Sequence, residues 1–139
     1  MKRILALAAL LAWAAVPAHA QTSRFLGQWV NATPGAALPH VFIGSSSAVG
    51  AVTVQVWARC TPTPCDWGRQ VGVIYSTSPS ISPTTGAVAV TAVFPTASGR
   101  STVVIRPVGT DRIEVTVFTQ FTDNSGRFNF TYQSVLQRP

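Results

Sequence analysis

Hydrophobic and polar residues alternate along most of the chain with the two-residue period that is typical of β-strands. In the segment 51–58, Val52, Val54 and Val56 fall on one face, while the residues between them fall on the other. The segment 112–121 shows the same alternation over ten residues, with isoleucine, valine and phenylalanine on one face and mostly charged or polar residues on the other. This pattern predicts strands that are buried on one side.

The alternation and the turn residues between its runs predict eight strands. These are Leu26–Asn31, His40–Ile43, Ala51–Ala58, Arg69–Tyr75, Ala87–Phe94, Thr102–Arg106, Arg112–Phe121 and Arg127–Leu136. The stretch 60–68 is predicted to be a loop, and 77–85, rich in serine and proline, a mobile connection. Because consecutive strands are joined by short turns, we expect an antiparallel up-and-down barrel, with a two-sheet β-sandwich as the alternative.

Composition strengthens the all-β prediction. Valine, isoleucine and threonine supply 38 of the 119 residues from Gln21 onward, whereas leucine occurs three times, glutamate once and lysine never. β-Branched residues suit a pleated surface, and good helix formers are nearly absent. A chain of this length folds as about one domain, so 21–139 is predicted to be a single domain.

The first 20 residues resemble a secretory signal peptide. Lys2 and Arg3 precede an uncharged apolar run, and a small-x-small cleavage site ends at Ala20. The run is too short to span a bilayer, and no second one follows, so we expect a secreted or periplasmic protein without a membrane span. Losing Lys2 and Arg3 lowers the formal net charge from +6 to +4. The remaining arginines are scattered, which argues against nucleic-acid binding.

Cys60 and Cys65 are the only cysteines in the chain. An exported protein with two cysteines is expected to join them as a disulfide. Two prolines lie between them, and the small ring would staple the loop between the third and fourth strands. A ring of this size contributes on the order of 2 kcal/mol in the chain-entropy model.

Candidate catalytic chemistry is sparse. His40 is the only histidine after the signal, and the four acids, Asp66, Asp111, Glu114 and Asp123, show no paired-carboxylate spacing. We therefore expect no enzyme activity, no bound metal and no cofactor.

The aromatic residues point to binding. Most of those in strands are expected to be core: Trp29, Trp57, Phe94, Phe118, Phe128, Phe130 and Tyr132. Trp57, Asp66, Trp67 and Tyr75 are the candidate ligand contacts, because a tryptophan beside a stapled loop is a rigid anchor. The small residues Gly72, Ala87, Ala89 and Ala92 fit either a space inside the barrel or tight packing.

The segment Phe25–Asn31 resembles the first strand of the calycin barrels, the lipocalins and avidins, through its Gly27-Gln28-Trp29 motif. The resemblance implies an eight-stranded barrel in which Gly27 and Trp29 are structural and an arginine near the last strand, Arg127 or Arg138, covers the indole. The Cys65-Asp66-Trp67-Gly68 segment is also similar to uncharacterised bacterial secreted domains, which imply no activity.

Three functions follow from these features. The first is a binding module for a small apolar or aromatic ligand at the open end of a barrel. The second, from a similarity to small-barrel bacterial periplasmic protease inhibitors, is an inhibitor of a secreted protein partner that uses the arm 21–24. The third is a ligand-free structural domain of the envelope. The oligomeric state stays open.

Overall fold

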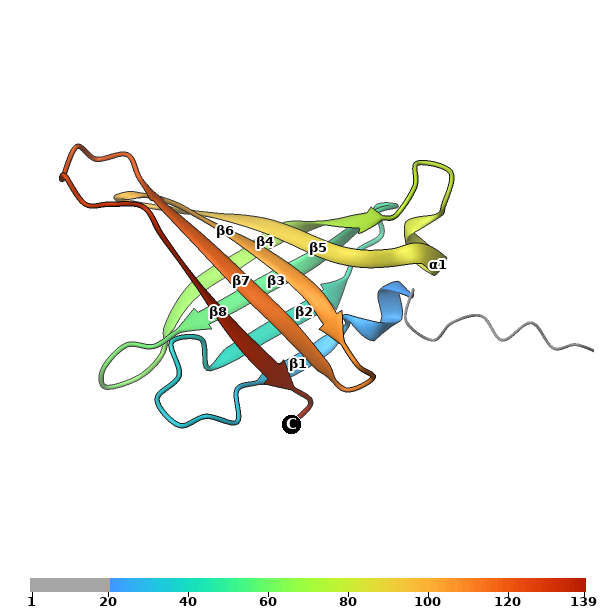
Figure 1. Ribbon diagram of the computed structural model, residues 1–139, viewed down its shortest axis with the longest axis horizontal. Coiled ribbons are helices and arrows are strands. Elements are labelled where there is room, and N and C mark those ends of the chain that lie inside the picture. Colours follow the sequence, from blue (N-terminus) through green and yellow to red (C-terminus); the bar gives the residue numbers. More distant parts are fainter. Residues whose placement is uncertain (1–20) are drawn as a thin grey trace, which may run out of the picture.

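The computed structural model describes residues 21–139; the predicted signal peptide, 1–20, lies outside the described residues. Its elements are the 3-10 helix η1 (Thr22–Arg24), the strands β1 (Gly27–Val30), β2 (His40–Ser45), β3 (Ala51–Ala58) and β4 (Cys65–Ser76), the helix α1 (Pro83–Gly86), and the strands β5 (Ala87–Thr96), β6 (Gly99–Val108), β7 (Arg112–Phe121) and β8 (Phe130–Gln137). Figure 1 shows their arrangement.

The eight strands form a closed barrel in sequence order, and every neighbouring pair is antiparallel. The predicted up-and-down barrel is therefore confirmed over the sandwich. The strand pairs differ in length. β6 and β7 pair along their whole length, whereas β1 and β8, which close the barrel, pair only at Val30 and Gln137.

The observed strand boundaries agree best with the predicted ones where the hydrophobic alternation is regular. Both β3 and β7 have the predicted bounds, but β4 begins at Cys65 rather than Arg69. The predicted loop 60–68 is therefore partly strand. Cys65 is joined to Cys60 by the expected disulfide, and it pairs with Ala58 of β3. The pairing of β3 with β4 shifts register between Gln55 and Trp57, so the added residues at the start of β4 can pair with β3 as well.

The predicted mobile connection 77–85 holds most of α1. Its N-cap is Ser82, whose hydroxyl accepts a hydrogen bond from the Thr84 N–H at 3.2 Å. Together with the three residues of η1, these four helical residues leave the described chain almost entirely β, as the composition predicts.

The core lies inside the barrel and is filled by side chains. The buried apolar residues are Phe25, Trp29, Leu38, Val41, Ile43, Val52, Val54, Val56, Ala87, Val90, Ala92, Phe94, Val103, Ile105, Ile113, Val115, Val117 and Leu136. The three valines predicted to share a face on β3 are all among them. Eight of these eighteen residues are valines, whose branched side chains interdigitate across the narrow interior.

Gly72 shows that the interior is tightly packed. A Cβ atom at this position would lie 2.7 and 2.8 Å from methyl groups of Val54 and Val52. The tight-packing interpretation of Gly72 therefore holds. Because Gly72 faces inward, its neighbours Val71 and Val73 point to solvent, and their apolar face is the outer one.

Trp29 closes one end of the barrel. Its side chain is 2% exposed, and its Nε1–H donates to the Phe25 carbonyl at 2.8 Å. The guanidinium carbon of Arg138 lies 3.8 Å from the centre of the Trp29 ring. The same side chain donates to the carbonyls of Leu26 and Arg24. Burial of the indole, the partner for its N–H and the covering arginine all agree with the expected role of Trp29.

The arginine that covers Trp29 is Arg138, just after β8, and not Arg127. Assigning Arg127 to this structural role was wrong, because Arg127 precedes β8 and lies against Phe121 at the opposite end. Gly27 is required for a related reason. It has a φ of +109°, and a Cβ atom there would lie 2.6 Å from a nitrogen of Arg138.

Candidate ligand-binding site at the open end

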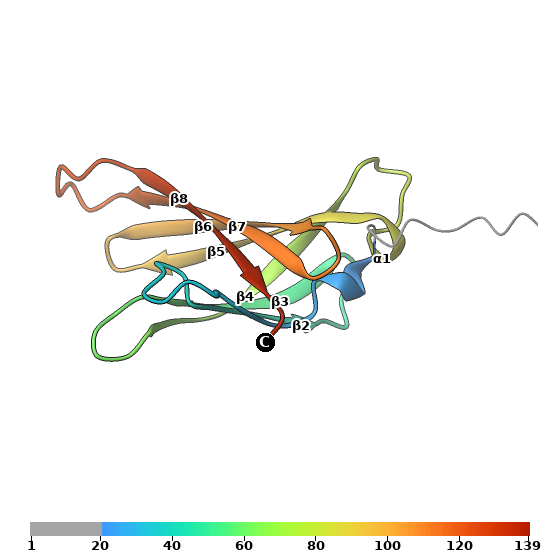
Figure 2. The same cartoon turned by 60° about the horizontal axis from the view of Figure 1, so that its bottom comes forward.

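Four connections meet at the end of the barrel opposite Trp29. They are the turns or loops after β1, β3, β5 and β7, and Figure 2 shows them together on the left. Within 21–139, the other end carries η1, α1 and the connections after β2 and β6. We call these the open end and the closed end.

The inward faces of four strands form a continuous wall at the open end. The register places Phe94, Ser101, Thr119 and Phe130 opposite one another on β5, β6, β7 and β8. The hydroxyl oxygens of Ser101 and Thr119 lie 3.0 Å apart and share a hydrogen bond. The wall therefore has an aromatic ring at each side and a satisfied polar pair in its middle.

Three rings on β7 and β8 stack into what we call the aromatic ladder: Phe121, Phe130 and Tyr132. The ring centres of Phe121 and Phe130 lie 6.1 Å apart, as do those of Phe130 and Tyr132, and the ring planes are inclined by 28° and 19°. The central ring remains 50% exposed, although it belongs to the inward face. The ladder is a preformed apolar surface in contact with solvent.

Tyr132 forms the inner step of the ladder and is partly buried against the core. Burial raises the pKa of its phenol above the ordinary value of 10.0, because the charged phenolate loses hydration. The hydroxyl therefore stays protonated at neutral pH, and it offers a ligand one hydrogen-bond donor beside the apolar rings.

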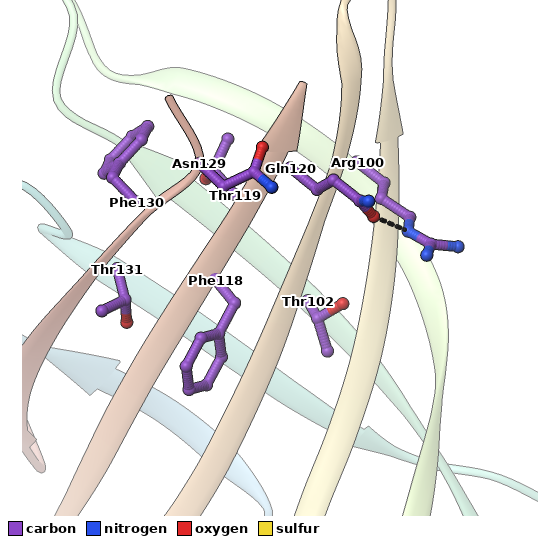
Figure 3. A pocket seen from close by; sticks show the side chains of 8 residues that line it. All are labelled: Arg100, Thr102, Phe118, Thr119, Gln120, Asn129, Phe130 and Thr131. Carbon is purple, nitrogen blue, oxygen red and sulfur yellow. Dashed lines mark hydrogen bonds between the residues drawn. The ribbon is translucent and has the colours of Figure 1, made fainter. Parts of the chain in front are cut away.

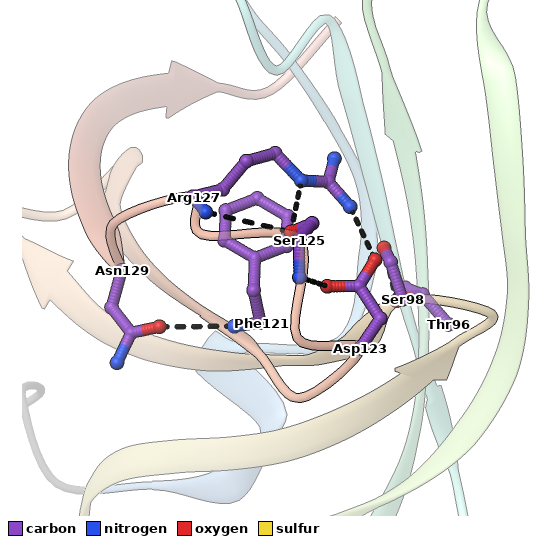
Figure 4. Close-up of polar contacts among 7 residues, drawn as sticks. All are labelled: Thr96, Ser98, Phe121, Asp123, Ser125, Arg127 and Asn129. Carbon is purple, nitrogen blue, oxygen red and sulfur yellow. Dashed lines mark hydrogen bonds and ion pairs between the residues drawn. The ribbon is translucent and has the colours of Figure 1, made fainter.

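A hydrogen-bonded loop holds the outer step of the ladder (Figure 4). The guanidinium carbon of Arg127 lies 4.0 Å from the centre of the Phe121 ring, and its Nη2 contacts an Asp123 oxygen at 2.8 Å. Ser125 accepts from Arg127 Nε at 2.9 Å. Asn129 accepts from the Phe121 N–H at 3.0 Å. These contacts order the loop 122–129 and so fix the rings that flank it.

The same loop lowers the pKa of Asp123 below its ordinary value. The largest cause is hydrogen bonding from the Ser125 side chain. Desolvation, which raises the pKa, comes second, and it is outweighed once the Ser125 backbone N–H and the Arg127 guanidinium add their lowering effects. Because the ionised carboxylate accepts these bonds, the loop is best held when Asp123 is charged.

Trp67 closes the wall on the side of β4. Its ring centre lies 5.7 Å from that of the buried Phe94, and the side chain is partly buried against the core. Trp67 and Tyr132 thus pack from opposite sides over a filled interior. A ligand at this end would lie on the ladder instead of entering the barrel.

The four candidate contacts from the sequence do not lie together. Trp67 faces inward at the open end, but Trp57 lies on the outer face, where its ring meets His40 edge-on at 6.4 Å. Asp66 shapes the start of β4 by accepting from the Gly68 N–H and the Gln55 amide, each at 2.8 Å. Tyr75 lies on the outer face near the closed end.

The expectation that most strand aromatics are core is wrong. Among the seven, Trp29 and Phe94 are buried, whereas Phe118, Phe128 and Phe130 are at least 49% exposed. Phe121, Phe130 and Tyr132 were not among the predicted ligand contacts. The shared face of Phe130 and Tyr132 was visible in the alternation, but their exposure depends on how β8 meets β1.

A shallow pocket of about 390 Å³ lies on the outer face behind the ladder. Figure 3 shows the side chains that line it, from β6, β7, the start of β8 and Asn129 just before it; the Arg100 Nε–H donates to Gln120 at 2.9 Å. Phe130 and Thr119 contribute to this lining too, so the outer pocket and the inner ladder share one thin part of the wall.

No protein-family model matches the chain, and comparisons with curated proteins and with solved structures find no match either. Residues 21–139 bring no three histidine, cysteine or acidic side chains close enough to hold a metal ion. Within the same range, no helix is long and apolar enough to cross a membrane.

Proposed function

We propose that the protein is a secreted or periplasmic binding module that takes a small aromatic or apolar ligand at the open end of its barrel, without catalysis. The observation that carries the proposal is the aromatic ladder, whose central ring, Phe130, is half exposed between two stacked neighbours. A soluble protein has no folding reason to expose a fixed aromatic stack, and such surfaces mark binding sites.

The geometry favours a planar ligand. A ring that stacks on Phe130 gains about 0.5–1.5 kcal/mol beyond the burial of its area. The Tyr132 hydroxyl can donate one hydrogen bond to a polar group on the ligand edge. Because the interior is filled, the ligand would cover the ladder on one face only, which predicts modest affinity for a small compound.

The resemblance to calycins supports the same function. The chain has an eight-stranded antiparallel barrel, a Gly-x-Trp first strand and an arginine stacked on that tryptophan. Calycins bind ligands at the open end of the barrel, and we propose that this chain is calycin-like in that respect. The disulfide between Cys60 and Cys65 fits the oxidising compartment that the predicted signal peptide implies.

The inhibitor alternative has less support. It needs the arm 21–24 to enter a protease cleft, but these residues fold against the closed end. The Thr22 hydroxyl donates to the Pro83 carbonyl at 2.6 Å, and Arg138 donates to the Arg24 carbonyl at 3.0 Å. An arm with these contacts would have to leave the barrel before it could reach a partner.

Ligand titration of the mature protein tests the proposal. Indole and 2-naphthol serve as probes, and chemical-shift changes of the backbone amides report where they bind. We expect saturable changes centred on Phe130 and Tyr132. Replacing Phe130 by alanine removes the central step and should weaken binding roughly tenfold or more.

Phe128→Ala is the matched control, because Phe128 is also a phenylalanine of the same segment but is 91% exposed and makes no ring contact within the described chain. It should bind the probes as the wild type does. If neither probe produces saturable changes, or if both variants lose affinity equally, the ladder is not the site and the ligand-free envelope domain becomes the better hypothesis.

A further inference from the structure

The seam between β8 and β1 leaves most of one strand edge without a partner. β8 has eight residues and β1 has four, and the two strands pair only through Gln137 and Val30. After Val30 the chain turns away, since the Asn31 side chain accepts from the Thr33 N–H and Thr33 accepts from the Ala36 N–H. The rest of the β8 edge therefore faces no strand among residues 21–139.

The hydrogen-bond pattern shows which backbone groups point to this edge. Arg138 N–H donates to the Asp111 carbonyl, one position beyond the paired residues Gln137 and Arg112. Bonded pairs alternate along an antiparallel ladder, so Leu136, Ser134 and Tyr132 also bond to β7. The residues between them turn their N–H and C=O groups towards the open edge. Those of Gln137 meet Val30, whereas those of Thr131, Gln133 and Val135 face no strand within residues 21–139.

A groove of about 380 Å³ runs along this open edge. One wall is β8, from Tyr132 to Val135, and the other is the loop after β1. That loop is held in place by Arg59, which donates to the carbonyls of Gly35 and Ala37 at 2.8 and 2.9 Å. The space is thus a slot with two fixed walls, and one wall carries free backbone donors and acceptors.

Within β8 itself, the edge lacks the sequence features that protect exposed strands. Natural sheet edges carry charged side chains, prolines or bulges that prevent pairing with another chain. The segment 130–137 has no charged residue, no proline and no glycine, and its register with β7 is uninterrupted. An unprotected edge inside a preformed slot is suited to accept a strand.

We propose that this groove binds an extended peptide segment of a partner protein, which adds to the barrel as a strand beside β8. Only another extended backbone can satisfy the alternating N–H and C=O groups of Thr131, Gln133 and Val135. The two walls favour a single strand over the edge of a second barrel. The loop after β1 forms the far wall of the groove, where the second strand of an added sheet would have to lie.

The side chains of β8 define the chemistry of the peptide. Peptide residues opposite Thr131, Gln133 and Val135 would point outward, and those opposite Tyr132 and Phe130 would point inward. The inward positions lie against the exposed rings, so apolar or aromatic side chains are expected there, and uncharged polar ones in between. This inference concerns the backbone edge and does not depend on small-ligand binding.

Hydrogen exchange of the mature protein, with and without a probe peptide, tests the proposal. The probe is acetyl-Gln-Val-Gln-Phe-Gln-Val-Gln-amide, which has the alternating pattern. Without peptide, the amides of Thr131, Gln133 and Val135 should exchange fast, while that of Ser134, bonded to β7, should be protected. Millimolar peptide should protect the three edge amides. Unchanged exchange rates of these three amides at the highest peptide concentration that stays in solution would overturn the proposal.

Methylated probes test the backbone pairing on the unaltered protein. N-methylation of the two glutamines that flank the phenylalanine removes donors that face β8, and it should abolish protection. N-methylation of the phenylalanine removes a donor that faces away, and it should leave binding within about threefold. An equal effect of both modifications would mean that the peptide does not bind as a strand.

The protein variant Gln133→Pro should weaken peptide binding roughly tenfold or more, since it removes an edge donor and places a ring in the groove. Gln133→Ala keeps the donor and should bind normally. The far-UV circular dichroism spectrum and an unchanged chemical shift of the buried Trp29 indole N–H are the check that the proline variant retains its fold. Protection of the edge amides that rises with protein concentration in the absence of peptide would overturn the proposal in favour of a second copy of the chain.

Discussion

The two ends of the barrel use the same kinds of residue in opposite ways. At the closed end, Trp29 is buried, its N–H is bonded and Arg138 covers its ring. At the open end, Arg127 also covers an aromatic ring, that of Phe121, but the stack continues to a half-exposed Phe130. One arginine–aromatic contact seals the core, and the other supports an exposed surface.

The difference follows from the partners around each pair. Arg138 donates to the carbonyls of Leu26 and Arg24, so it ties the residue after β8 to the segment just before β1. Among residues 21–139, the side-chain contacts of Arg127 are all with groups of its own hairpin, Asp123, Ser125 and Phe121. Contacts that join distant segments stabilise the whole barrel, whereas local contacts stabilise a loop. The closed end should therefore govern stability and the open end binding.

Truncation of the two tryptophans is expected to have the largest effect. Trp29→Ala leaves a cavity under Arg138, and it should lower the free energy of unfolding by about 3–5 kcal/mol. Trp67→Ala, at the open end, should cost less, because Trp67 is only partly buried. Urea denaturation of each variant measures both losses. A larger loss for Trp67→Ala would contradict the assignment of stability to the closed end.

Substitution of Gly72 tests whether the interior between the two ends is as full as the packing indicates. Gly72→Ala places a methyl group against Val54 and Val52, and overpacking of this kind should cost about 1–3 kcal/mol. Val54→Ala in the same chain frees that space, so the double variant should lose less stability than the sum of the two single variants. Denaturation curves measure the three losses of unfolding free energy. If the loss of the double variant equals the sum of the two single losses, Gly72 borders a cavity and not a tightly packed site.

The closed end was largely predictable from the sequence, and the open end was not. The structural role of Trp29 and an arginine over its ring were expected because the resemblance to calycins, carried by the Gly27-Gln28-Trp29 motif, implies both. Choosing Arg138 over Arg127 needs the register of β8 and the position of the chain start. Neither is encoded in the alternation of a single strand.

The aromatic ladder escaped prediction for a related reason. Alternation assigns Phe130 and Tyr132 to the inward face, which is correct, and inward normally means buried. Here β8 pairs with β1 only at Gln137, so within residues 21–139 no strand lies beside Phe130 on that side, and its ring stays half exposed. Trp57 and Tyr75 were wrongly grouped with Trp67, because both lie on the outer face, whereas Trp67 faces inward at the open end.

Removal of the two arginines should have intermediate and unequal effects. Arg138→Gln loses the stacking on Trp29 and bonds to two carbonyls, and it should cost roughly 1–3 kcal/mol. Arg127→Gln removes contacts of an exposed loop and should stay within about 0.5 kcal/mol. Thermal unfolding of the two variants under one condition gives the comparison. Equal losses would mean that the two ends contribute alike.

The smallest effect concerns acid, and it should be confined to the open end. The pKa of Asp123 is lowered in the folded chain by its bonds to Ser125 and Arg127, so its contribution to loop order is complete above the ordinary carboxyl pKa. That contribution is lost as the pH falls through the lowered, folded-state pKa of Asp123. An NMR titration should show the amides of Ser125 and Arg127 shifting with this pKa, while the Trp29 indole N–H does not respond. Asp123→Asn removes the transition and serves as the control. If the Trp29 signal followed the same titration, the two ends would be coupled through the barrel, and the loop around Arg127 could no longer be treated as a local structure.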